Sequence, residues 1–155
     1  MKTINATLWN FLFVLVFLVS TSFAVVQNCE VNITTPAVGS QVGGKALISG
    51  TATIPPSGHL WILSHQVGIN GYWPQGNGPA QIKRDRWNVL VYFGEPGDLG
   101  MFEVVAIVVD DQSHQTLIAW VQSAPNTSPP YQPISLPMIL ESCTMQTLLV
   151  DKTHN

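Results

Sequence analysis

Residues His59–Gln75, HLWILSHQVGINGYWPQ, contain the stretch that decides the fold. The first half is a short apolar run, which predicts a central β-strand ending near Gln66. The second half turns at Gly68 and Gly71 and carries two aromatic residues into a loop. We therefore expect a buried strand followed by a surface loop, and this loop is the first place to look for a binding site.

Two segments before this strand alternate between apolar and polar residues, a pattern typical of half-buried strands. The first is Glu30–Thr35, EVNITT, which ends at Pro36. The second is Lys45–Ile54, KALISGTATI, and a Pro-Pro-Ser-Gly turn separates it from His59. The residues that we expect to face inward from the second segment are Ala46, Ile48, Gly50, Ala52 and Ile54.

Further strands are predicted after the aromatic loop. Residues 86–93, RWNVLVYF, alternate again, and residues 101–111, MFEVVAIVVDD, are apolar on both faces, as expected of a strand covered from both sides. A short strand near 80–83 and a final strand over 144–150 bring the total to about seven. This spacing of strands and turns predicts an all-β fold, a β-sandwich with Greek-key connections. The inward face of the 86–93 strand should consist of Trp87, Val89, Val91 and Phe93.

One helix is predicted before the last strand, over residues 112–123, where it would cover the second face of the 101–111 strand. Either Asp111 or Ser113 can cap its first turn. Residues 125–137 contain five prolines, which predict an extended crossover. The apolar stripe of the helix, at helical spacing, consists of His114, Leu117, Ile118 and Val121.

Residues 1–24 have the pattern of a signal peptide. Lys2 precedes the apolar run FLFVLVFLV, and Ser22-Phe23-Ala24 supplies the small residues of a cleavage site. The run has nine residues, whereas a membrane-spanning helix needs about 20. An uncleaved anchor is the alternative. We expect residues 25–155 to form one exported domain, secreted or periplasmic, with no membrane span after cleavage.

Two cysteines, Cys29 and Cys143, lie near opposite ends of the exported chain. An exported protein meets oxidants, and two cysteines allow a single intramolecular pairing. We therefore predict a disulfide between them, with free thiols or intermolecular bonds as the alternatives. The net charge is −3 at pH 7, and no basic patch is present to bind phosphates. We therefore expect no nucleic-acid partner, because such a chain binds phosphates poorly.

The segment ITTPAVGSQVGGKALISGTA, residues 33–52, resembles the opening of bacterial extracellular immunoglobulin-like modules. The strand that begins at Trp87 is similar to the middle of such modules, so the likeness covers about residues 30–111. The resemblance implies an immunoglobulin-like Greek-key β-sandwich. Such modules serve adhesion, spacing and ligand binding, so the resemblance implies a fold more than a function. Asp85-Arg86 replaces the Asp-Gly common before the tryptophan strand, and the inserted helix departs from the family pattern.

Histidines and acids offer the candidates for chemistry. His59 and His65 share one strand face but lie about 20 Å apart, too far to share a metal ion. Glu95 and Asp98 lie in the glycine-rich loop 94–100 without calcium-binding spacing. No nucleophile motif is present, so the sequence predicts no catalytic residue, no metal site and no cofactor. The alternative is a small secreted hydrolase or enzyme inhibitor that uses His59 or His65 with the acids of this loop.

The remaining aromatic residues separate into core and loop. Trp61 and Trp87 are expected in the core, because each lies on an apolar strand face. Tyr72 and Trp73, together with Gln75, form the predicted binding surface. In the alternative, Trp73 folds back and plugs one end of the sandwich. The sequence thus favours a non-catalytic interaction module that binds a protein or glycan of the cell envelope or extracellular space.

Overall fold

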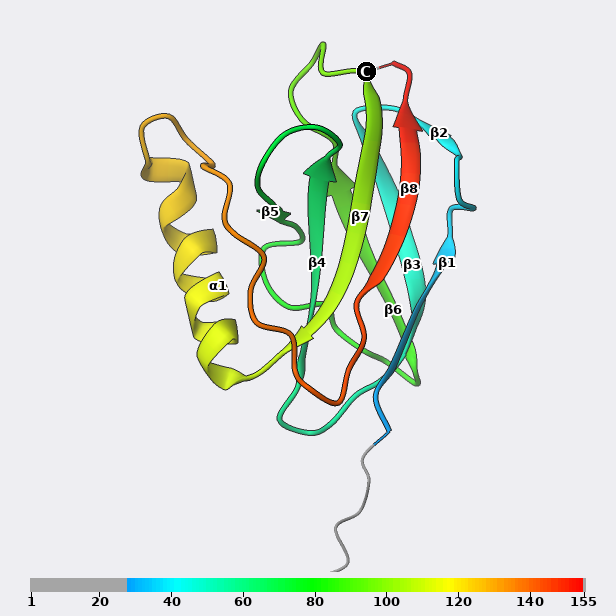
Figure 1. The fold of residues 1–155 in the computed structure, drawn as a ribbon, viewed down its shortest axis with the longest axis vertical. Coiled ribbons are helices and arrows are strands. Elements are labelled where there is room, and N and C mark those ends of the chain that lie inside the picture. Colours follow the sequence, from blue (N-terminus) through cyan, green and yellow to red (C-terminus); the bar gives the residue numbers. More distant parts are fainter. Residues whose placement is uncertain (1–27, 155) are drawn as a thin grey trace, which may run out of the picture.

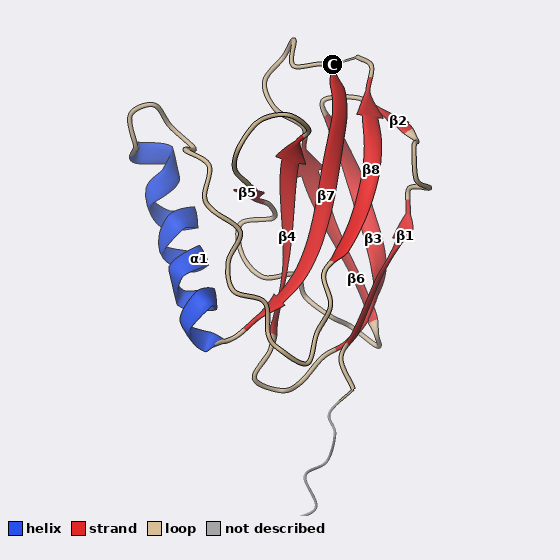
Figure 2. Cartoon of the chain, viewed as in Figure 1, coloured by secondary structure: helices blue, strands red, loops and turns tan. Residues whose placement is uncertain are grey.

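The computed structural model describes residues 28–154, which form two β-sheets and one helix (Figures 1 and 2). One sheet is antiparallel, and its strand order is β1 (Glu30–Thr35), β3 (Lys45–Thr53), β6 (Arg86–Tyr92). The order of the second sheet is β2 (Gln41–Val42), β8 (Gln146–Lys152), β7 (Gly100–Val109), β4 (His59–Gln66), β5 (Trp73–Pro74). The helix α1 (Asp111–Ser123) follows β7, and a 3₁₀ turn, Ala124–Asn126, follows the helix.

The main core lies between the two sheets and follows from the alternation of β3 and β6. Trp87 is 2% exposed, and its indole Nε1 donates to the Thr51 carbonyl at 3.2 Å. Gly50 lies opposite Trp87 in the register of β3 and β6. A Cβ at Gly50 would collide with the Trp87 indole and with the Asn32 carbonyl oxygen, so this position requires glycine. The inward faces predicted for both strands are confirmed.

A second core lies on the outer face of the five-stranded sheet, under α1. Trp61 and Leu63 of β4 and Leu117 of α1 belong to it, together with Val105, Ile107 and Val109 of β7. The covering of β7 from both sides is therefore confirmed, and the molecule has three layers: sheet, sheet and helix (Figure 2). Trp61 is buried as expected, but it packs under the helix rather than between the sheets.

The strand predicted near 80–83 does not form. Residues 75–80 instead run beside β4, where Gln75 N donates to Ile62 O at 2.9 Å and Ala80 N donates to Leu60 O at 2.7 Å. Pro79 has no N–H to donate, and glycines interrupt the segment, so a continuous strand ladder is disfavoured. The last strand begins at Gln146, two residues later than expected.

The predicted disulfide between Cys29 and Cys143 is present, with a Cα–Cα distance of 5.0 Å. It joins the residue before β1 to the segment before β8. Because β1 and β8 belong to different sheets, the bond ties the two sheets together at one end.

The first turn of α1 corrects one prediction. Asp110 is the N-cap, and its carboxylate accepts a hydrogen bond from Ser113 N at 2.8 Å. This hydrogen bond holds the pKa of Asp110 below its ordinary value, because it stabilises the ionised form. The expected capping residues, Asp111 and Ser113, do not cap the helix. Asp111 is consequently free to pair with another element.

Among residues 28–154, no helix has the length and apolar character needed to span a membrane. The predicted signal peptide, residues 1–24, lies outside the described residues.

Candidate functional site

The proline-rich crossover lies against the outer face of the five-stranded sheet, beside α1 (Figure 1). It pairs with the aromatic loop through two hydrogen bonds, Tyr72 N to Ile134 O and Ile134 N to Tyr72 O, each 2.9 Å. Just after the crossover, Leu140 N donates to Val108 O at 2.8 Å. The crossover is therefore a fixed part of the helix-side layer, and it brings residues 132–137 next to α1.

Two tryptophans from different elements donate hydrogen bonds to adjacent backbone carbonyls of the crossover. Trp73 of β5 donates its indole N–H to Tyr131 O, and Trp120 of α1 donates its indole N–H to Gln132 O, both at 2.8 Å. Tyr131 is 54% exposed, and its ring centroid lies 6.4 Å from that of Trp120. We call Trp73, Trp120 and Tyr131 the aromatic surface.

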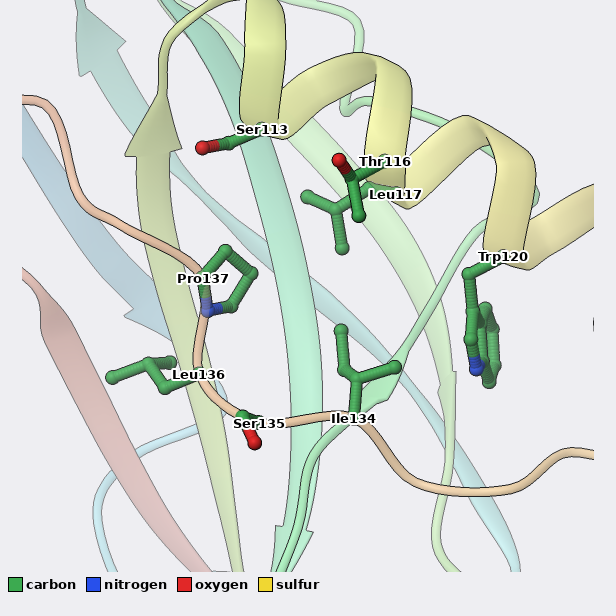
Figure 3. A pocket seen from close by; sticks show the side chains of 8 residues that line it. All are labelled: Ser113, Thr116, Leu117, Trp120, Ile134, Ser135, Leu136 and Pro137. Carbon is green, nitrogen blue, oxygen red and sulfur yellow. The ribbon is translucent and has the colours of Figure 1, made fainter.

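A groove with a volume of about 400 Å³ lies between α1 and the crossover (Figure 3). Residues 134–137 form the crossover side, and the indole of Trp120 stands at one end. None of the eight lining residues is charged. The groove therefore combines an apolar surface with a few hydroxyl groups. The lining residues on the helix side are Ser113, Thr116, Leu117 and Trp120.

Gln75, one of the three residues predicted to bind, is a structural residue here. Its side chain is 8% exposed; Nε2 donates to Trp73 O at 3.0 Å, and Oε1 accepts from Tyr92 N at 2.9 Å. It thus links β5 to the edge of β6. Trp73 is half-buried, and its indole N–H is held by the Tyr131 carbonyl of the crossover.

Tyr72 is also half-buried, and its ring stacks on His65 with centroids 4.8 Å apart. His65 Nδ1 lies 2.9 Å from Gly71 O. Gly71 has a φ of 114°, and a Cβ there would collide with Pro133 of the crossover. The loop and the crossover therefore approach each other closely, and the backbone bonds between Tyr72 and Ile134 hold this contact.

A cluster that the sequence did not predict lies at the start of α1. His59 Nε2 lies 2.7 Å from Asp111 Oδ1, and the His59 and His114 rings stack with centroids 3.9 Å apart and planes at 10°. Trp61 donates its indole N–H to His114 Nδ1 at 3.2 Å. Burial, followed by the nearby charge of His59, lowers the pKa of His114, and Asp111 partly opposes this shift. We call these four residues the histidine latch.

The loop acids Glu95 and Asp98 lie far from His59, one of the two histidines expected to work with them. Asp98 Oδ2 accepts from Glu95 N at 2.8 Å, so the pair closes its own loop. His59 lies opposite Val109, at the far end of β7 from loop 94–100, roughly 30 Å away at about 3.3 Å per residue. The acid that meets His59 is Asp111. Among residues 28–154, no group of three or more His, Cys, Asp or Glu side chains could hold a metal ion.

Trp120 and Tyr131 were missed as candidate site residues. A signal for Trp120 was available, because Ser113, Leu117 and Trp120 follow the i, i+4, i+7 spacing of one helix face. No comparable signal identified Tyr131, because its position depends on the path of an irregular segment.

Comparisons with protein-family models and with curated protein sequences found no match to this chain.

Proposed function

We propose that this chain is an exported, non-catalytic recognition module that binds a neutral protein segment or glycan in the groove between α1 and the crossover. The observation that carries the proposal is the groove itself, a volume of about 400 Å³ with the Trp120 indole at one end. Concave, mainly apolar sites with a few polar groups are typical of ligand-binding sites.

The chemistry of the lining favours an uncharged ligand. Ser113, Thr116 and Ser135 offer hydroxyl groups that donate and accept hydrogen bonds, while Leu117 supplies an apolar floor. The Trp120 ring is held in place by its bond to Gln132 O. A ring that is fixed before binding loses little conformational entropy when a sugar ring or an apolar side chain stacks on it.

The aromatic surface extends this site beyond the groove. Tyr131 is exposed next to Trp120, and Trp73 fixes the carbonyl of Tyr131. The predicted binding residues thus take different roles in the proposal: Trp73 holds the carbonyl of Tyr131, Tyr72 pairs with the crossover, and Gln75 links β5 to β6.

We also propose that the two sheets form an immunoglobulin-like Greek-key sandwich and that the chain is exported. The strand order supports the fold, because β1 belongs to one sheet while β2, the next strand, pairs in parallel with the last strand of the other. The disulfide supports an oxidising compartment outside the cytosol, in agreement with the predicted signal peptide.

A charged side chain placed over the groove should abolish binding. We expect Thr116→Arg to lower binding to a glycan array or to an array of uncharged peptides by at least about tenfold, because a long cation would cover a neutral site. Gln115→Arg is the matched control, since Gln115 is exposed on the same helix but does not line the groove. Equal binding by both variants, or equal loss, would remove the groove as the binding site.

A secreted hydrolase is the second candidate, and one observation favours it. A carboxylate 2.7 Å from His59 Nε2 can orient an imidazole for proton transfer. The pair lies outside the groove. If the chain hydrolyses esters or glycosides, Asp111→Asn should lower that rate at least about 100-fold. No change in the rate would exclude this pair from catalysis.

A further inference from the structure

We propose that the histidine latch is a pH-sensitive contact that holds the first turns of α1 against the sheet at neutral pH and releases them on acidification. The latch lies at one end of the helix that forms a wall of the groove. The latch concerns the packing of the helix itself, so it does not depend on ligand binding in the groove.

A hydrogen bond from Trp61 to His114 lies at the centre of the latch. An indole N–H can only donate, so its partner, His114 Nδ1, must be unprotonated. His114 is therefore neutral in the latched structure, with its proton on Nε2. Trp61 is fully buried, and this bond satisfies its single polar atom.

A proton on Nδ1 of His114 would break the hydrogen bond from Trp61. The new N–H would point at the indole N–H of Trp61, and two donors cannot bond to each other. The buried indole would lose this acceptor, which favours any arrangement that gives it another. The contact between β4 and the first turns of α1 would therefore weaken when His114 is protonated.

Two titratable neighbours of His114, His59 and Asp111, have opposite effects on its protonation. From β4, the His59 ring stacks on it, and a proton on His59 would pair with Asp111 while repelling a proton on His114. Asp111, on α1, attracts a proton on His59 and a proton on His114. Its side chain is 80% exposed, however, so solvent screens its charge. The other neighbouring acid, Asp110, is bonded to Ser113 N.

The elements packed on the other sides of the latch contribute no opposing charge. The positions of β7 opposite His59 and Trp61 are Val109 and Ile107. From the crossover, the side chains packed against this core are apolar, Ile134, Leu136 and Ile139. Burial among these groups disfavours a charged imidazole.

The direction of the pH effect follows from the lowered pKa of His114. When the helix start is released, the imidazole regains its ordinary pKa, about 6.5, so the released form binds more protons at mildly acidic pH. The latch is therefore fully stabilising above about pH 6.5 and loses strength as the pH falls toward the lowered pKa.

The release should be local. Leu117 is the buried residue of α1, while Ser113 and His114 are half-buried. The start of the helix thus depends on the latch, whereas its middle is held by Leu117 in the second core. Release would move Ser113, and with it one end of the groove.

Native-state hydrogen exchange of the ¹⁵N-labelled protein tests the proposal without any ligand. Between about pH 7.5 and about pH 5, protection factors in the first two turns of α1 should fall by up to about tenfold for each pH unit, and those of β7 should change little. His114→Asn should abolish this pH dependence, because its side-chain oxygen can accept from Trp61 and does not titrate. His154→Asn, at the exposed C-terminal end, is the matched control and should keep it.

Two results would overturn the latch: protection in α1 that does not change between these pH values, or the same pH dependence in His114→Asn. An NMR titration of the wild-type His114 ring needs no variant and gives a third test. A pKa at or above about 6.5 would contradict the proposal. Groove binding is a separate measurement, so a failed latch leaves it untouched.

Discussion

Replacing Cys29 and Cys143 with alanine is expected to lower the free energy of unfolding by about 4 to 5 kcal/mol. The two cysteines are 114 residues apart, and a cross-link over so long a loop removes a large amount of conformational freedom from the unfolded chain. A typical domain is stable by about 5–15 kcal/mol, so this loss would leave the protein close to unfolding. Urea denaturation of the double variant and of the oxidised wild type measures the difference.

Reduction of the wild-type protein is the control for this experiment. The reduced protein should lose nearly the same stability as the double variant, because both lack the same cross-link. A difference below about 1 kcal/mol between oxidised wild type and double variant would contradict the prediction. It would show that the sheets hold the ends of the chain together without the bond.

The strands and their inward faces could be predicted because side-chain alternation is a local property. Trp87 and Val89 lie two residues apart on a strand, with the exposed Asn88 between them, and this alternation allows one orientation. The helix could be predicted for a related reason: the 101–111 strand is apolar on both faces, so a further layer had to cover it.

The layer of Trp61 could not be predicted in the same way. β4 is apolar on both faces, with Leu60 and Ile62 toward the other sheet and Trp61 toward the helix. Alternation separates these two sets but does not say which set faces which neighbour. The assignment depends on the position of α1, which packs on the side of Trp61.

The site was harder to predict because its residues meet only through long-range packing. His59 and Asp111 are 52 residues apart in sequence, and their contact depends on the register of β4 and β7 and on where the helix begins. The helix cap is Asp110 and not Asp111, one residue earlier than expected. This leaves the Asp111 carboxylate available to contact His59. The bond from Trp120 to Gln132 depends on the path of an irregular segment, which no periodic pattern describes.

Replacing Trp87 with alanine is expected to lower the free energy of unfolding by about 3 to 5 kcal/mol. The side chain is 2% exposed in the core between the sheets, so its removal leaves a cavity and loses the buried apolar contacts. The Thr51 carbonyl also loses the indole donor. The nearby Gly50 has no side chain with which to fill the space. Urea denaturation followed by far-UV circular dichroism measures the change.

Trp120→Ala is the matched comparison, because it removes the same side chain from a half-buried position at the groove. We expect it to cost only about 1 to 2 kcal/mol, mainly through the lost bond to Gln132 O, and to abolish groove binding. The two variants thus separate stability from the proposed recognition: Trp87 packs in the core between the sheets, and Trp120 is the ring that we propose contacts a ligand. Equal losses of stability in the two variants would contradict this division, because they would place Trp120 in the core of the fold rather than at its binding surface.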